Sequence, residues 1–188
     1  MNQSPAGHRL WHQRLLGLIL ALFALGLDQG HKIWMLEVFD IQSRQPVAIS
    51  PNLDLVLAWN KGISYSLLSS DTETGRWALF ALSLSLILVL VVWLWRSGSF
   101  AMSSGLGLII GGALGNAYDR YAHGAVADFF LLHIDTQSWG RLNWYIFNCA
   151  DVAIVAGVLL LLYDSWMGPM GQAPQPEADP VKGTGDMP

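Results

Sequence analysis

The chain has 188 residues, enough for one domain, with a net charge of −4 and a single cysteine, Cys149. Hydrophobic residues make up 53% and charged residues only 13%, against roughly 25% charged in an average soluble domain. This composition excludes a disordered chain, a nucleic-acid-binding protein and an ordinary cytosolic enzyme, and the lone cysteine excludes an intramolecular disulfide. The mean hydropathy is +0.39 although the C-terminal residues are polar. The composition therefore indicates a membrane protein.

Four stretches are long and apolar enough to cross a hydrocarbon core of about 30 Å, which takes about 20 residues in a helix. The second carries no charge and the fourth carries only Asp151. Tryptophans lie near most of the ends, as in an interfacial aromatic belt. We expect membrane-spanning helices at 15–36, 77–95, 100–118 and 145–163.

The first stretch has an alternative interpretation as a cleaved signal peptide. Arg9 and Arg14 precede a short apolar run, and residues 24–26 could mimic a small-residue cleavage site. However, apolar residues resume after Asp28 and continue through 33–36. We therefore favour a retained helix that spans the membrane.

The distribution of arginines predicts the orientation. Arg9 and Arg14 precede the first span, and Arg96 lies in the short loop between the second and third spans. The two larger loops mix both signs of charge. Because positive charges accumulate on the cytoplasmic side, both termini should be cytoplasmic and the two larger loops should lie outside.

The first outer loop, residues 37–76, is too long to serve only as a connection. Residues 53–59 alternate between apolar and other side chains with a period of two, which favours a small sheet on the outer surface. Residues 167–188 hold five of the eight prolines and are expected to form a disordered cytoplasmic tail. The predicted fold is an all-α polytopic membrane protein, a four-span domain over 1–166, with this small β-structure on the outer face.

Polar residues of three spans fall at one depth. With a rise of 1.5 Å per residue, all of them lie in the outer third of the membrane. Residues four apart in the third span share one helix face, as do residues three apart in the fourth. The residues are Asp28 in the first span, Asn116 and Arg120 in the third, and Asn148 and Asp151 in the fourth. Gly112 shares the helix face of Asn116 and Arg120.

Each of these features also has a purely structural interpretation. Asp28 and Lys32 are four residues apart and could form a structural ion pair. The two asparagines could be interhelical hydrogen-bonding groups, and Asp128 could be a solvated loop acid. A stripe of small residues on the third span, at Ser103, Gly107, Gly111 and Gly115, is suited to close helix contact. Asp151 is harder to explain structurally, because an unpaired carboxylate inside a membrane is costly.

When the common catalytic motifs are excluded, one arrangement of residues that could catalyse a reaction remains. The sequence has no serine-hydrolase elbow, zinc-binding histidine pair or phosphate-binding glycine loop. Cys149 lies two residues from Asp151, so its side chain points about 200° away around the helix. Asp128 and Asp151 could meet at the outer surface, where two close carboxylates share a proton and act on water as acid and base. This is the arrangement of aspartyl proteases.

Five ordered motifs, over about residues 15–163, closely resemble the lipoprotein signal peptidase (signal peptidase II) family. They are LDQGHK at 27–32, NKG at 60–62, GGALGNAYDR at 111–120, VADF at 126–129 and FNCAD at 147–151. The chain departs from the family pattern at residues 64–66 and at Cys149. The first departure puts in doubt the contacts of the β-cradle and the inhibitor affinity, and neither affects the expected chemistry.

The resemblance implies a bacterial inner-membrane aspartyl endopeptidase that cleaves prolipoprotein signal peptides just before the diacylglyceryl-modified cysteine. It implies catalysis by Asp128 and Asp151, with no metal or cofactor. It also implies a small outer β-cradle over residues 53–68 and inhibition by the antibiotic globomycin. The expected partners are lipidated precursors and membrane lipid, with the enzyme as a monomer. By the same analogy the substrate-binding residues are Asn60, Gly62, Asn116, Arg120 and Asn148, and the supporting residues are Asp28, Lys32, Gly112 and Ala150.

Two other classes of protein remain open at this point. A small transporter could also carry intramembrane Asp, Lys and Asn, although the polar set here lies at one edge instead of crossing the membrane. A structural assembly subunit would leave Asp151 unexplained.

Overall fold

The computed structural model describes residues 5–62, 73–136, 138 and 140–170. Four long helices form a bundle: α1 (Pro5–Ile33), α3 (Glu73–Arg96), α4 (Phe100–His123) and α5 (Cys149–Met170). α1 continues into a short π-helix, Trp34–Val38. Each long helix contains a segment that is long and apolar enough to cross a membrane, so the four predicted spans are confirmed.

The start of the fourth span was predicted wrongly. Residues 145–147 belong to a strand, and α5 begins only at Cys149. The physical reason is that Asn148 caps the helix, since its side-chain oxygen accepts a hydrogen bond from the backbone N–H of Asp151. α5 then continues to Met170, and residues 171–188 of the expected tail lie outside the described residues.

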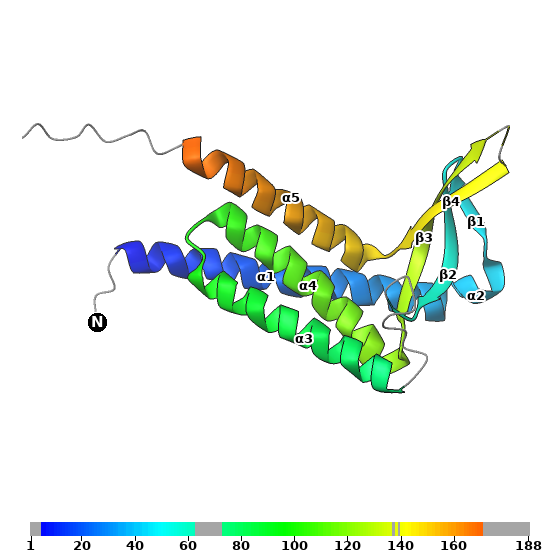
Figure 1. Ribbon diagram of the computed structural model, residues 1–188, viewed down its shortest axis with the longest axis horizontal. Coiled ribbons are helices and arrows are strands. Elements are labelled where there is room, and N and C mark those ends of the chain that lie inside the picture. Colours follow the sequence, from blue (N-terminus) through cyan, green and yellow to red (C-terminus); the bar gives the residue numbers. More distant parts are fainter. Residues whose placement is uncertain (1–4, 63–72, 137, 139, 171–188) are drawn as a thin grey trace, which may run out of the picture.

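A four-stranded antiparallel sheet stands at one end of the bundle (Figure 1). The segment between the first two long helices, expected to lie outside, forms the short helix α2 (Ile41–Arg44), then β1 (Val47–Ser50) and β2 (Leu53–Asn60). The strand predicted from the alternation at 53–59 is therefore confirmed in β2. Residues 63–68, the rest of the expected β-cradle, lie outside the described part of the chain.

The segment between α4 and α5 supplies the other half of the sheet, as β3 (Val126–Thr136) and β4 (Gly140–Phe147). No strand was predicted there. β3 pairs with β2, so Ala58 lies opposite Asp128, and β4 pairs with β3 and forms one edge. The sheet depends on pairing between segments about 70 residues apart in the chain, which local periodicity does not reveal.

α4 is the central helix, in contact with α1, α3 and α5 (Figure 1). The predicted stripe of small residues lies against α1: a Cβ atom at Gly107 would overlap the backbone of Gly17, and one at Gly111 would overlap the carbonyl of Ala21. On another side of α4, a Cβ at Gly112 would lie 2.5 Å from the carbonyl oxygen of Ala150. The absence of side chains at these glycines therefore allows α1 and α5 to approach α4 closely.

A second apolar cluster attaches the sheet to the bundle. Met35, Ile41, Ala127 and Phe129 are buried together where the π-helix and α2 meet β3. Gly124 ends α4 with a φ of +77° and directs the chain into β3. Asp128 lies between two anchored residues of this cluster, so its backbone is fixed relative to the helices.

The close contact between α1 and α4 can be tested with two matched glycine-to-alanine variants. Gly107→Ala should destabilise the protein by roughly 1–3 kcal/mol, because the new methyl group meets backbone that cannot move aside. Gly26→Ala, on the exposed side of α1, meets nothing within 4 Å and should leave stability unchanged or slightly raised. Thermal unfolding in detergent compares the two, and equal midpoints would contradict this account of the packing.

Candidate active site

The predicted site residues come together at the sheet end of the bundle, where α4 and α5 meet β2 and β3. Asp128, on β3, is only 2% exposed. Asp151 lies in the first turn of α5 and is partly buried. Asn116, Asn148 and Asn60 each form a hydrogen bond to one of these two carboxylates. The convergence of polar groups predicted for three spans is therefore present, and β3 adds the second acid.

Two asparagine side chains connect the acids. The amide of Asn148 donates to Asp128 Oδ1 at 2.7 Å and to Asn116 Oδ1 at 3.0 Å. The amide of Asn116 in turn donates to Asp151 Oδ1 at 3.0 Å. Both carboxylates thus accept from neutral donors, and an amide cannot neutralise them as a cation would. Such a connection holds two acids in fixed positions while leaving them free to exchange protons.

Asn148 and Asp151 also form a reciprocal cap at the start of α5. Asn148 Oδ1 accepts from the backbone N–H of Asp151 at 3.0 Å, and Asp151 Oδ2 accepts from the backbone N–H of Asn148 at 3.3 Å. This is a capping-box geometry, with the acid at the third helical position. A helix N-terminus favours negative charge, so this location suits a carboxylate.

Asp128 has the more perturbed environment of the two acids. Burial raises its pKa from 3.8 to about 6. The hydrogen bond from Asn60, at 3.2 Å to Oδ2, lowers the pKa, and the charge of Asp151 raises it. Hydrogen bonding from Asn148 and the charge of Lys32 also lower it, but burial has the largest effect. Asp128 therefore keeps its proton to a much higher pH than an exposed aspartate.

Asn60 is itself oriented by the backbone that follows it. Its Oδ1 accepts from the N–H of Gly62 at 3.1 Å, which leaves its amide to donate to Asp128. Gly62 has a φ of +149°, a conformation that L side chains rarely adopt, so glycine is required there. A groove of about 380 Å³ runs from Asn60, Gly62 and Asp128 along β3 and β4 to Asn143 and Tyr145.

Arg120 lies one turn beyond Asn116 on α4 and is partly buried. Its guanidinium donates to the carbonyl of Asn116 at 3.3 Å and interacts electrostatically with both Asp128 and Asp151. It is thus a cation close to the acid pair, with donors that can bind a carbonyl or another acceptor at the site.

The residues expected to support the site form a buried layer behind it. Lys32 forms the predicted ion pair with Asp28, at 2.7 Å. Lys32 Nζ also donates to Asn116 Oδ1 at 3.3 Å. Asp28 is fully buried and accepts from the backbone N–H of Ala150 at 2.9 Å, while the carbonyl of Ala150 faces Gly112. The structural interpretation of Asp28 and Lys32 is consistent with these contacts.

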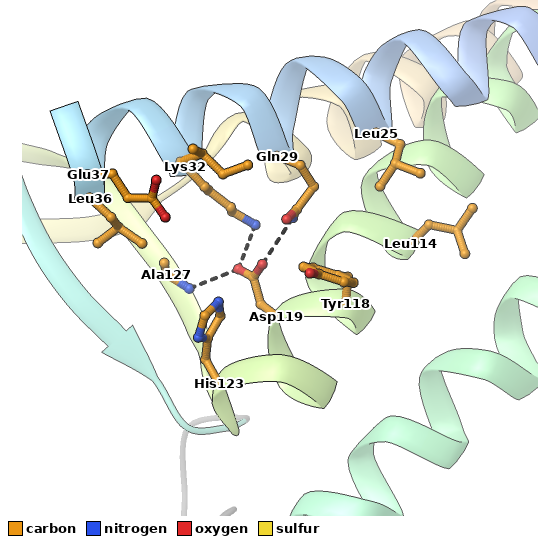
Figure 2. Close-up of a pocket in the computed structure, with 11 residues that line it drawn as sticks. Leu25, Gln29, Lys32, Leu36, Glu37, Leu114, Tyr118, Asp119, His123 and Ala127 are labelled. Carbon is orange, nitrogen blue, oxygen red and sulfur yellow. Dashed lines mark hydrogen bonds and ion pairs between the residues drawn. The ribbon is translucent and has the colours of Figure 1, made fainter. Parts of the chain in front are cut away.

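Sequence reasoning missed one acid in this layer, Asp119. It is 2% exposed and lies 2.7 Å from Lys32 Nζ. It also accepts from the side chain of Gln29 at 3.0 Å and from the backbone N–H of Ala127 at 3.1 Å (Figure 2). A signal was available: Asp119 continues the four-residue spacing of Gly111 and Gly115, so it faces α1, where Lys32 could pair with it.

Cys149 faces away from the acids. It lines a different, apolar cavity together with Phe23, Leu27 and Val152, as the angular argument predicted. Within the residues that the structure describes, no three His, Cys, Asp or Glu side chains are grouped so that they could hold a metal ion.

Comparison with known proteins identifies the family. The family model for signal peptidase (SPase) II matches residues 20–167. The chain belongs to the signal peptidase II family. The lipoprotein signal peptidase of Methylocella silvestris is 52% identical over 158 residues, covering 84% of this chain and 90% of the relative. That of Beijerinckia indica is 48% identical over 166 residues, covering 88% and 96%.

Solved structures share the fold. A bacterial membrane enzyme determined by the in meso method at 2.3 Å resolution matches with a TM-score of 0.67 and 24% identity, over 85% of this chain and 92% of the other. A second, at 1.9 Å, matches with a TM-score of 0.60 and 25% identity, over 79% and 91%. The resemblance inferred from the five motifs is thus confirmed, and the chain is a membrane peptidase instead of a transporter or an assembly subunit.

The environment of Asp128 predicts its titration. Its carboxyl group should lose its proton as the pH rises through about 6. Asn60→Ala removes a donor that stabilises the ionised form, so the midpoint should rise by about one pH unit. Infrared spectroscopy can follow the carboxylic-acid band, assigned by its loss in Asp128→Asn. Asn52→Ala is the matched control, because Asn52 bonds to the His133 carbonyl elsewhere in the sheet. A midpoint near 4 in the unmodified protein, or an equal shift in both variants, would contradict the prediction.

Proposed function

We propose that this chain is an aspartyl endopeptidase of the bacterial inner membrane that removes signal peptides from prolipoproteins. It cleaves just before the diacylglyceryl-modified cysteine, and Asp128 and Asp151 activate the attacking water. The observation that carries the proposal is the pair of acids joined through Asn116 and Asn148, in a chain that belongs to the signal peptidase II family.

The different environments of the two acids support different roles. Asp151, at the N-terminus of α5, is the base that takes a proton from water as the water oxygen attacks the carbonyl carbon. Asp128, whose pKa is raised to about 6, donates its proton to the carbonyl oxygen. In the collapse of this gem-diol intermediate, protonated Asp151 donates its proton to the nitrogen of the leaving lipidated cysteine as the C–N bond breaks. One hydroxyl of the intermediate gives its proton to Asp128 as the C=O bond of the new carboxyl group forms, which restores the starting state.

Two cavities beside the acids suit the two parts of such a substrate. The groove of about 380 Å³ at Asn60, Gly62 and Asp128 has polar walls and could take an extended peptide. A second cavity of about 380 Å³, at Asp151 and Val155 on α5 and Tyr145 on β4, is almost wholly apolar. We infer that the peptide lies in the first and the diacylglyceryl group lies beside the second, within the bilayer.

The remaining site residues bind and orient the peptide in this proposal. Arg120 offers a cation for a substrate carbonyl, and Asn60 and Asn116 orient the acids while their free hydrogen-bonding capacity contacts the peptide backbone. Gly62 allows close approach of the chain, and Asn148 connects the acids. Globomycin is the expected inhibitor, no cofactor is required, and the enzyme acts as a monomer.

The orientation follows from the arginine distribution together with the fold. The described ends of α1 and α5 lie together at the end of the bundle opposite the sheet (Figure 1). Because Arg9, Arg14 and Arg96 are at that end, we place both termini in the cytoplasm and the acid pair at the periplasmic face.

The decisive test replaces the two acids. Asn has nearly the shape of Asp but cannot exchange a catalytic proton. Asp128→Asn and Asp151→Asn should therefore each reduce turnover by about 10³-fold or more. A general acid or base usually contributes about 10²–10⁴-fold to the rate, and this loss lies at or beyond the upper part of that range. The double variant should be little worse than either single one, since the pair acts as a unit. Turnover of a lipidated precursor is measured per inserted molecule, with globomycin as the check that the cleavage belongs to this activity.

Cys149→Val is the matched control, because it changes the same turn of α5 on the side away from the acids and should retain full activity. Substantial cleavage by either Asn variant would overturn the aspartyl mechanism. Cleavage that globomycin does not block would argue against the proposed substrate site.

A further inference from the structure

A second pair of buried aspartates lies behind the acid pair. Asp28 on α1 and Asp119 on α4 are 0% and 2% exposed, and the proposed reaction uses neither of them. Asp128 and Asp151 accept from asparagine amides, whereas Asp28 and Asp119 both form an ion pair with Lys32. A buried charge is costly unless it is paired, so such a pair needs an explanation.

Each of these aspartates accepts the backbone N–H of the residue that immediately precedes one member of the acid pair. Asp28 Oδ1 accepts from Ala150, the residue before Asp151, at 2.9 Å. Asp119 Oδ2 accepts from Ala127, the residue before Asp128, at 3.1 Å. Both hydrogen bonds are buried. The backbone next to each member of the pair is therefore held by its own carboxylate.

Lys32 and Gln29 join these two carboxylates to each other. Lys32 Nζ lies 2.7 Å from Asp28 Oδ2 and 2.7 Å from Asp119 Oδ2. The Gln29 amide donates to Asp28 Oδ2 at 3.2 Å. It also donates to Asp119 Oδ1 at 3.0 Å (Figure 2). Asp28, Gln29, Lys32 and Asp119 thus form one unit, the carboxylate clamp, which ties the start of β3 to the start of α5.

Close packing does not surround the Asp119 side chain of the carboxylate clamp on every side. A cavity of about 590 Å³, with Leu25, Leu114 and Tyr118 at its apolar end, lies beside Asp119 and Lys32 (Figure 2). Hydrogen bonds and the ion pair therefore determine where the carboxylate lies on that side. The cavity also leaves room for a side chain one methylene longer.

We propose that the carboxylate clamp sets the relative position of the two catalytic aspartates, with Asp119 as the positioning residue for Asp128 and Asp28 as the positioning residue for Asp151. The proposal rests on the proposed function, since it assumes that Asp128 and Asp151 act together on one water. Neither Asp119 nor Asp28 touches the substrate. Reaction rates are sensitive to this geometry, because a displacement of about 1 Å can cost about 10²-fold.

The first test measures kcat and KM separately for the variant Asp119→Asn. The substitution removes the charge that pairs with Lys32 and keeps the size of the side chain. We expect kcat to fall about 10- to 100-fold while KM changes less than about twofold, because the proposed peptide and lipid contacts are untouched. Asp119→Glu restores the carboxylate into the space beside the cavity and should recover most of the lost kcat.

Asp164→Asn is the matched control. Asp164 on α5 accepts a hydrogen bond from Ser99, the N-cap residue of α4, so it also ties two helices together, but at the end of the bundle away from the acids. This variant should lower the thermal midpoint without changing kcat. If Asp119→Asn keeps kcat within twofold, or if both variants lower activity only in proportion to stability, the clamp is a structural feature alone and the proposal is wrong.

A second test changes no charge, and its main measurement, the titration of Asp128, needs no substrate. Gln29→Met removes the amide that connects Asp28 and Asp119, so any effect on Asp128 comes through geometry. The infrared titration midpoint of Asp128 should move by about half a pH unit or more, and kcat should fall several-fold. An unchanged midpoint would overturn the proposal even if Asp119→Asn failed to insert. Failure of the proposed function is distinct, since it would appear as cleavage by Asp128→Asn or as no cleavage by the unmodified enzyme.

Discussion

The ammonium group of Lys32 occupies the point at which the helices and the sheet of this protein meet. It lies between two buried carboxylates and also donates to Asn116, whose amide bonds to Asp151. A charge in this environment is stable only if its partners surround it, and those partners come from α1 and α4. The close approach of α4 to α1 at the small-residue stripe is what brings the partners within reach. The arrangement of the site therefore depends on one buried charge and on the glycines that allow it to be paired.

The two acids differ although their chemistry is the same. Asp151 is capped into a helix N-terminus by Asn148, whereas Asp128 is on a strand, buried between two anchored apolar residues. Burial raises the pKa of Asp128 to about 6, and Asn60 moderates the effect. Such an acid pair can hold one proton between its two members, because burial favours the protonated form of Asp128. The neutral amides of Asn116 and Asn148 are consistent with such a pair, because a cation in their place would favour two ionised carboxylates.

Much of the fold and many of the site residues could be predicted from local patterns. Apolar stretches of sufficient length predicted the four spans, and a period of two predicted β2. Helical spacing placed Asn116 and Arg120 on one face and predicted that Gly107 and Gly111 contact another helix. Only part of the carboxylate clamp could be predicted from the sequence. Asp28 and Lys32 are four residues apart, so their pairing follows from helical spacing. Asp119 is 87 residues beyond Lys32, and its pairing depends on which face of α4 meets α1.

The sequence by itself determined that this is a four-span membrane peptidase of the signal peptidase II family, because hydropathy, helical periodicity and the five motifs are all properties of short segments. Tertiary structure alone decided that the loop between α4 and α5 completes the sheet and that Asp119 holds the backbone beside Asp128. These features arise from strand pairing and from buried hydrogen bonds between distant segments. Such contacts form only when the glycine-lined helices have packed, so no local pattern encodes them.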